Sequence, residues 1–357
     1  MAPAVAEYIA PRLPVGSPPL RIDGDLRKEE WSRAAWSSLF TEIRGVDAPA
    51  HARPPASCGT RVKMLWDEEF LYVGAELHSS AEVVASFTAR NEPIFQRDSD
   101  FEVFVDPAGS CAWYKEVEIN ALNAVWNLML SRPYMDGGDE YSGRIASPGE
   151  PRFYDARAQL SATRLLRGKL NDPAGASWAV ELALAHSDTL AHVSGVPPPA
   201  VGHRWRINFS RVEQRGEINW VWTPQCVWEP TKKRYEGKVN MHLPDAWGVV
   251  QFAPAEGAPV HLDADYSAQQ AAMSIYYAQR AFREKTGEYT TELDDLQVDE
   301  TLVTMFDVLI VKENEGYTAA VTSKKRKGQS SRVTHERRLE FTETTQAMES
   351  LDHRDVR

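Results

Sequence analysis

Residues 178–184 read WAVELAL, and this stretch decides the fold. Every second residue from Trp178 to Leu184 is large and apolar, whereas Ala179, Glu181 and Ala183 lie between them. Successive side chains of a β-strand point to opposite faces of a sheet, so this alternation indicates one buried face and one face of different character. The stretch therefore predicts a β-strand in an antiparallel sheet.

The same two-residue period recurs on both sides of this stretch, at residues 71–77 and 205–209. Turn-forming residues separate the segments, as in Asp106–Gly109 and Asn171–Gly175. Short alternating segments with turns between them are typical of sandwiches and barrels. We therefore predict a mainly β protein, with an antiparallel β-sandwich of the immunoglobulin or jelly-roll kind at residues 18–254.

The pattern differs at the two ends of the chain. Residues 1–17 are rich in Ala and Pro and are predicted to form an extended N-terminal lead-in. After a Pro/Gly/Ala linker, residues 266–284 have apolar side chains at helical spacing. Two strand-like runs follow at residues 307–312 and 317–322 and predict a hairpin. We expect a small α+β extension at 255–345 and a flexible tail at 346–357.

Composition excludes several classes of function. The 357 residues carry a formal net charge of −11, and a nucleic-acid-binding surface needs a basic face. The acidic surface also disfavours anionic lipid, and the chain has no apolar run long enough to span a membrane. We therefore expect neither a nucleic-acid partner nor a membrane partner.

The three cysteines and the N-terminus bear on compartment. Cys58, Cys111 and Cys226 are widely spaced, which disfavours structural zinc and a disulfide framework but leaves one bridge plus a free thiol open. The N-terminus lacks a basic segment followed by an apolar one, so no secretory signal is predicted. As printed, the chain is expected in the cytoplasm, or outside the cell if its N-terminus is incomplete.

Seven short blocks occur in a characteristic order between residues 21 and 252. They are IDGDL (22–26) with Glu30-Trp31, VKMLWDE (62–68), DSDFEVFVDP (98–107), EVEIN (116–120), WAVE (178–181), WRINF (205–209), and HLP (242–244) with Trp247-Gly248. Together these blocks resemble the family 9 carbohydrate-binding modules. The resemblance covers about two-thirds of the chain and implies a β-sandwich that binds sugars.

The resemblance implies a sugar held between two aromatic faces with polar groups at its rim. The first aromatic position falls at Phe95 and the second at Met241, so both depart from the tryptophan of the family pattern. A nearby insertion carries Trp228 and Tyr235. Aromatic rings cover the C–H faces of a sugar, and polar side chains bind its hydroxyls. The predicted ligand-binding residues are Phe95, Arg97, Glu102, Glu118, Asn120, Trp222 and Trp228.

The carboxylates on these strands also have to be considered as catalysts or metal ligands. Asp100 and Glu102 share one face of a predicted strand, as do Glu116 and Glu118, at separations of roughly 6–7 Å between backbones. Glycosidase carboxylates are about 5–9.5 Å apart but face each other across a cleft. Neighbours on one strand are typical of rim acceptors or metal ligands, so we predict no catalytic residues.

The resemblance further implies a structural Ca²⁺ ion, although no cofactor is required. Acidic residues near predicted turns offer oxygen ligands, but their spacing defines no ligand set. These residues are Asp23, Asp25, Asp67, Glu68 and Asp106.

The sequence as a whole favours non-catalytic binding of a poly- or oligosaccharide. Two alternatives remain open. The chain could belong to a glycoside-hydrolysing, carbohydrate-catabolic system, with a glycoside hydrolase or another protein as its partner. It could also be an interaction domain that kept the fold and lost the sugar, because fold alone does not determine function.

Overall fold

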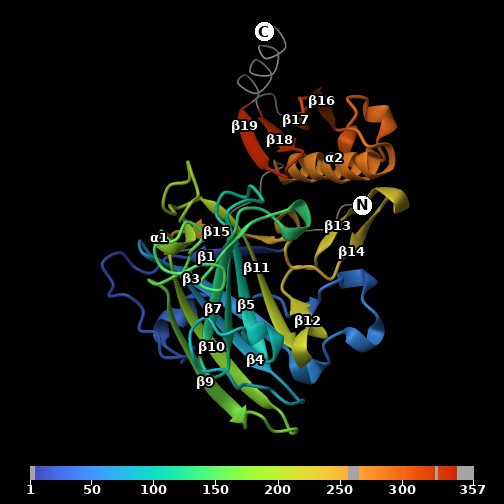
Figure 1. The fold of residues 1–357 in the computed structure, drawn as a ribbon. Helices are drawn as coiled ribbons and strands as arrows, with labels where there is room; N and C mark the ends of the chain where they lie inside the picture. Colours follow the sequence, from blue (N-terminus) through green and yellow to red (C-terminus); the bar gives the residue numbers. More distant parts are fainter. Residues whose placement is uncertain (1–4, 256–264, 326–328, 344–357) are drawn as a thin grey trace.

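A computed structural model describes residues 5–255, 265–325 and 329–343. Two β-sheets are stacked face to face, and a smaller unit with one long helix lies at one end of them (Figure 1). This arrangement confirms the prediction of a mainly β protein with a small α+β extension. The tail predicted at 346–357 lies outside the described residues, as does most of the linker.

The larger sheet has nine strands. Its continuous path runs β1 (Glu7–Pro11), β15 (Gly248–Ala253), β11 (Arg204–Glu213), β5 (Asp100–Asp106), β6 (Tyr114–Asn120), β7 (Val125–Leu130) and β8 (Glu140–Tyr141). Off this path, β12 (Ile218–Val221) pairs with β11, and β2 (Thr41–Glu42) pairs with β12. The pairs are antiparallel except β1 with β15, which is parallel.

The smaller sheet has four antiparallel strands in the order β3 (Thr60–Trp66), β4 (Phe70–His78), β10 (Ala176–Ala185) and β9 (Leu160–Gly168). The stretch that begins at Trp178 lies in β10, where Trp178 pairs with Leu77 and Leu184 with Leu71. The predicted strand is therefore present, and it occupies an inner position in its sheet.

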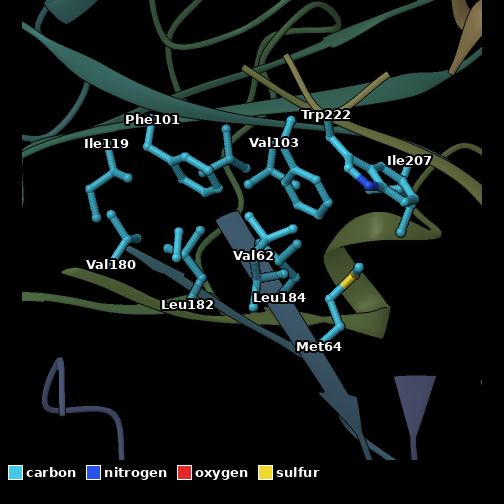
Figure 2. Close-up of a cluster of buried hydrophobic side chains, with 14 of the residues drawn as sticks. Val62, Met64, Phe101, Val103, Ile119, Val180, Leu182, Leu184, Ile207 and Trp222 are labelled. Atoms are coloured by element: carbon cyan, nitrogen blue, oxygen red, sulfur yellow. The ribbon is translucent and has the colours of Figure 1, made fainter. Parts of the chain in front are cut away.

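The main core lies between the two sheets. Side chains at alternate positions interdigitate there, with Phe101 and Val103 of β5 facing Val180 and Leu182 of β10 (Figure 2). Each of these four is at most 1% exposed. Burial of this kind stabilises the fold by about 1.5–3 kcal/mol per large apolar side chain. The alternation read from the sequence therefore identifies the inner faces of both sheets.

The N-terminal lead-in takes part in the sandwich. Residues Glu7–Pro11 form β1, which pairs with β15, and Trp66 Nε1 donates a 2.8 Å hydrogen bond to the Ala253 carbonyl beside it. The extended conformation predicted for this segment is confirmed. Its assignment outside the sandwich is wrong for residues 7–11, because their backbone completes the sheet edge.

Short helical turns join the strands. The 3₁₀ turns of the sandwich are η1 (Glu29–Arg33), η2 (Gly45–Asp47), η3 (Ala50–Ala52), η4 (Ala56–Cys58), η5 (Ile94–Gln96), η6 (Tyr134–Asp136), η7 (Gln214–Gly216), η8 (Pro230–Lys232) and η9 (Pro244–Ala246), and the α-helix is α1 (His186–Thr189). The insertion predicted as a loop forms a hairpin of β13 (Cys226–Glu229) and β14 (Arg234–Gly237).

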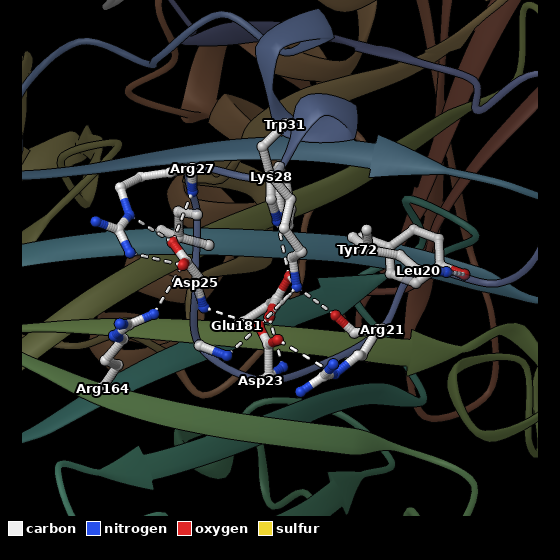
Figure 3. A network of polar contacts seen from close by, with 12 residues as sticks. Leu20, Arg21, Asp23, Asp25, Arg27, Lys28, Trp31, Tyr72, Arg164 and Glu181 are labelled. Atoms are coloured by element: carbon white, nitrogen blue, oxygen red, sulfur yellow. Dashed lines mark hydrogen bonds and ion pairs between the residues drawn. The ribbon is translucent and has the colours of Figure 1, made fainter.

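The outer face of the four-stranded sheet is covered by the segment that follows the lead-in. Glu181 of β10 lies fully buried there and receives hydrogen bonds from the backbone N–H groups of Asp23 and Gly24, both at 2.9 Å (Figure 3). Trp31 Nε1 donates at 2.7 Å and Lys28 Nζ lies 2.7 Å from Glu181 Oε1. This network joins the first sequence block to the sheet.

The C-terminal unit packs one helix on a four-stranded meander. It contains α2 (Asp265–Thr286), η10 (Leu293–Asp295), α3 (Glu300–Val303), β16 (Phe306–Lys312), β17 (Tyr317–Ser323), β18 (Gln329–Thr334) and β19 (Leu339–Glu343). The predicted helix and hairpin are confirmed. Residues 332–341, predicted as one strand, instead contribute to two strands, because Arg337 has a positive φ of 63° and turns the chain.

A buried arginine joins the C-terminal unit to the sandwich. The Arg337 guanidinium is inaccessible to solvent and lies 3.0 Å from Asp136 Oδ2 and 2.6 Å from Asp245 Oδ1. Asp136 belongs to η6 and Asp245 to η9, so two sandwich loops are held by one cation. The unit is therefore packed onto the sandwich through a specific polar contact.

Two further sequence-based expectations can be compared with the structure. No helix in the described part of the chain is both long enough and apolar enough to cross a bilayer. Cys58, Cys111 and Cys226 are all free thiols, so the single bridge left open by the sequence is not formed.

Candidate functional site

The outer face of the nine-stranded sheet carries an unusual set of side chains on β5 and β6. Phe101 and Val103 of β5 point into the core, so Asp100 and Glu102 must point outward from the same strand. On β6, Glu116 and Glu118 face outward for the same reason, since Val117 lies in the core. Four carboxyl groups therefore share the face of the sheet opposite to the core.

These strands form the floor of a depression with a volume of about 460 Å³. Its walls come from η5, η6, the segment after β14, and residues that follow β8. The lining residues are Phe95, Glu102, Phe104, Glu116, Glu118, Trp126, Leu128, Tyr134, Arg144, Asn219, Val239, Asn240, Met241 and His242. Segments far apart in the sequence thus converge above β5, β6 and β7.

The strand register places like charges directly opposite each other. Glu102 pairs with Glu118 across β5 and β6, and Glu116 pairs with Phe104. One carboxylate oxygen from each of Asp100, Glu102 and Glu118 lies within 4.8 Å of the others. Like charges opposite each other in a sheet destabilise it, so this arrangement needs protons or a positively charged group to offset the repulsion.

The carboxyl groups are buried and short of hydrogen-bond donors. Asp100 is 0% exposed, Glu118 2%, Glu116 5% and Glu102 6%. Both carboxylate oxygens of Asp100 and one oxygen each of Glu116 and Glu118 have no hydrogen-bond partner in the structure. A buried acceptor without a donor costs about 1–3 kcal/mol, more when it is charged. The floor of the depression therefore favours a ligand that donates hydrogen bonds.

Burial and mutual repulsion shift the proton equilibria of these acids. Burial raises the pKa of Glu102 to about 7, against a smaller lowering by the Ser210 hydroxyl. Burial, and then the neighbouring carboxyl groups, raise the pKa of Asp100, Glu116 and Glu118 well above the usual range. The acids of the floor therefore exchange protons at much higher pH than exposed carboxyl groups.

The polar groups on the walls are engaged with partners of their own. Arg144 forms an ion pair with Glu140, and Tyr134 donates a 2.9 Å hydrogen bond to the same carboxylate. His242 Nδ1 lies 3.0 Å from the Tyr114 hydroxyl. Burial lowers the pKa of His242 to about 4, so the imidazole is neutral near pH 7. These groups shape the depression without neutralising its floor.

Three of the seven predicted ligand-binding residues line this depression: Phe95, Glu102 and Glu118. Phe95 is partly buried, and its ring packs on Trp126 with the centroids 4.9 Å apart. Met241, which occupies the second aromatic position of the family pattern, lines the same depression. The two positions that the resemblance singled out are therefore brought together over one floor.

Asn120 and Arg97 do not line the depression. The Asn120 amide donates to the Phe87 carbonyl at 2.8 Å and to Asp98 at 2.7 Å, and its oxygen accepts from the Ala124 N–H. Arg97 is exposed and lies over the Phe87 ring. We correct both predictions for this site: Asn120 holds the turn after β6, and Arg97 lies outside the depression.

The two predicted tryptophans are also placed elsewhere. Trp222 is 4% exposed and packs in the main core on Phe209, and a Cβ at Gly248 would come within 2.3 Å of its ring. Trp228 is 7% exposed and donates a 2.7 Å hydrogen bond from Nε1 to the Gln297 carbonyl of the C-terminal unit. Their burial leaves no ring face for a saccharide, so this part of the predicted site is corrected.

The sequence-based prediction missed the walls of the depression. Trp126 pairs with Glu118 in the β6–β7 register, so recognising that hairpin would have placed it beside the floor. Tyr134, Arg144 and His242 lie in irregular segments, where no periodicity indicates the direction of a side chain. His242 was expected to be structural, and its hydrogen-bonding contact with Tyr114 accords with that reading.

The acidic residues near turns offer little to a cation because other groups occupy them. Asp23 lies 2.9 Å from Lys28 Nζ, and Asp25 is bound by Arg27 and Arg164 at 2.7 and 2.8 Å (Figure 3). Asp67 accepts two backbone N–H groups. Among the described residues, the triad of Asp100, Glu102 and Glu118 is the set whose oxygens are close enough to share one cation.

Comparison with known proteins gives structural likeness only. No family model matches the sequence, and no curated protein matches it. A family 9 carbohydrate-binding module from Caldicellulosiruptor kristjanssonii, solved with cellotriose, is 17% identical with a TM-score of 0.41 and aligns over 72% of this chain and 99% of its own. The same kind of module from that organism, solved with glucose, is 18% identical with a TM-score of 0.40, over 72% of this chain and 99% of its own.

A protein from Bacteroides uniformis, to which carbohydrate binding is provisionally assigned, is 13% identical with a TM-score of 0.47 and aligns over 70% of this chain and 100% of its own. The solved structures that resemble this chain therefore include family 9 carbohydrate-binding modules, as the sequence blocks led us to expect.

Proposed function

We propose that the depression above β5, β6 and β7 binds a saccharide without turning it over. The observation that carries this proposal is the joint presence of aromatic rings and hydrogen-bond acceptors in one hollow. Phe95, Trp126 and Tyr134 line it together with Glu102 and Glu118. Rings cover the C–H faces of a sugar, and carboxylates accept hydrogen bonds from its hydroxyls.

The size and the electrostatics of the hollow support this proposal. A volume of about 460 Å³ falls within the usual range of small-molecule sites. Sugar hydroxyls supply the donors that the buried oxygens of Glu116 and Glu118 lack. Unsatisfied acceptors discriminate strongly for ligands that donate to them, because a ligand without donors leaves the acceptors desolvated and unpaired.

Hydrolysis is the second candidate, and one observation favours it. Glu102 has a pKa of about 7, and one of its carboxyl oxygens lies within 4.8 Å of one of Glu118. An acid of raised pKa beside a second carboxyl group is the arrangement that glycosidases use. Here, however, both groups stand on adjacent strands of one sheet and point the same way, so a glycosidic bond does not lie between them.

Calorimetry of the full chain against a panel of neutral and charged oligosaccharides tests the proposal. We expect saturable binding at one site, with no new products by chromatography after prolonged incubation. Glu102→Gln should weaken binding about tenfold, whereas Glu315→Gln, on an exposed turn of the C-terminal unit, should leave binding unchanged. Repeating the titration with EDTA tests for a bound Ca²⁺ ion. Absence of binding across the panel overturns the proposal, and released products establish hydrolysis instead.

A further inference from the structure

We propose that the saccharide bound in this depression carries a protonated amino group, which is received between Glu102 and Glu118. The inference rests on the proposed function and names the class of ligand, an amino sugar with a free ammonium group. Three features of the floor carry it: its charge, its unmet hydrogen bonds and its position within the sheet.

The first feature is the excess of negative charge. Asp100, Glu102, Glu116 and Glu118 are all at most 6% exposed and stand together on one face of the sheet. Arg144 is the single Lys or Arg among the described residues that line the depression, and Glu140 already neutralises it. A neutral sugar would satisfy hydrogen bonds but leave this charge, whereas an ammonium group does both.

The second feature is the pattern of free acceptors. Glu116, whose unpartnered Oε2 is buried beside the triad, points into the same hollow. An ammonium group has three N–H donors, and acceptors about 2.8 Å from its nitrogen are about 4.6 Å apart. The oxygens of Asp100, Glu102 and Glu118 lie within 4.8 Å of each other, which suits three such bonds.

The third feature argues for an ammonium group and against a divalent cation. Ca²⁺ takes about 6–8 oxygen ligands, many of them backbone carbonyls. The floor lies in the middle of a sheet, where β5 is paired on both sides with β6 and β11, so its backbone carbonyls are used in the ladders. Ser210 donates to the Asn219 side-chain oxygen at 2.7 Å, which occupies that oxygen as well.

The walls add the contacts that a sugar ring needs beside its ammonium group. Phe95 and Tyr134 stand at the rim of the hollow, and Trp126 lies beneath Phe95. A cation above an aromatic ring gains further stabilisation, and the C–H faces of a sugar pack on the same rings. A metal ion alone would use neither the rings nor most of the volume.

Calorimetry with the full chain at about pH 6, where an aliphatic amine is protonated, tests the inference. The probes are a fully deacetylated glucosamine tetramer, its N-acetylated counterpart and a glucose tetramer of the same linkage. We expect the deacetylated tetramer to bind at least about tenfold more tightly than the other two. We also expect its binding to release protons, measured as a heat that depends on the buffer, because the ammonium group displaces protons from the floor.

Glu118→Gln separates this proposal from its rivals. The variant should remove the preference for the deacetylated tetramer and reduce proton release, while thermal melting shows that it is folded. Glu315→Gln makes the same change of net charge on an exposed turn and should keep the preference.

Equal affinity for the three tetramers, or a preference that survives in Glu118→Gln, overturns the inference. So does saccharide binding that requires added Ca²⁺ and is lost with EDTA, which would identify the floor as a metal site. Binding of neutral tetramers without a preference leaves the proposed function intact, whereas failure of every saccharide to bind removes both proposals.

Discussion

Glu181 and Glu118 are both buried carboxyl groups on the outward side of a sheet, but their surroundings differ. Glu181 on β10 receives two backbone N–H groups, the Trp31 indole and the Lys28 ammonium group. Glu118 on β6 stands opposite Glu102, and one of its oxygens has no donor. One carboxylate is fully satisfied by the chain, and the other is not.

This difference separates a structural acid from a functional one. A buried charge that the chain itself pairs and hydrogen-bonds holds segments together, as Glu181 does for the covering segment. A buried acid without donors costs stability, and such a cost is common at sites that bind a ligand. The two faces of the sandwich therefore perform different tasks with the same residue type.

The largest effect is expected at Glu181. Glu181→Ala removes the acceptor for four donors and leaves Lys28 without its buried partner, so the free energy of unfolding should fall by about 3–5 kcal/mol. Urea denaturation of the variant and the parent measures this. The fraction that remains folded should bind saccharide with unchanged affinity. A loss below about 1 kcal/mol would show that the network in Figure 3 is not a main support of the fold.

The strands were predictable from the sequence because each carries its face in its own periodicity. Trp178 to Leu184 alternates, and the structure buries those side chains between the sheets. The helix at 265–286 was predictable for the same reason, from spacing within one segment. Such signals are local and need no knowledge of how distant segments pack.

The site was only partly predictable because it depends on distant packing. Glu102 and Glu118 could be placed on an outer face, but their direct opposition depends on the β5–β6 register. Trp222 lies among residues that are buried on both faces of β12, so alternation could not tell core from site. Trp228 is covered by a unit that begins about 40 residues later, which no local pattern reveals.

The dependence of stability on pH should sharpen the comparison. A carboxyl group whose pKa is raised in the folded state makes the folded protein bind more protons than the unfolded chain, so stability falls as pH rises between the two pKa values. For Glu102 that window runs from its usual value of 4.5 to about 7. The pKa of Asp100, Glu116 and Glu118 is raised too, which acts in the same direction.

We therefore expect the free energy of unfolding to decline by about 1–3 kcal/mol across this window, at about 1.4 kcal/mol per unit of pKa shift. Urea titrations at a series of pH values should show a smaller decline in Glu102→Gln than in the parent. Burial lowers the pKa of Lys115 to about 7, which raises stability only between that value and 10.5 and so does not interfere. Parallel curves for the variant and the parent would mean that Glu102 titrates normally.

The smallest effect is expected at the rim of the depression. Phe95→Leu keeps an apolar side chain on Trp126 but removes a ring face, so affinity for a bound saccharide should fall about threefold to tenfold, equivalent to about 0.5–1.5 kcal/mol. Phe153 is likewise partly buried, next to Arg157 and outside this hollow, and Phe153→Leu provides the matched control. Calorimetry of both variants measures the difference. Because the acids of the floor remain in place, the preference among ligands should persist even as all affinities fall together; an equal loss in both variants would place the sugar away from Phe95.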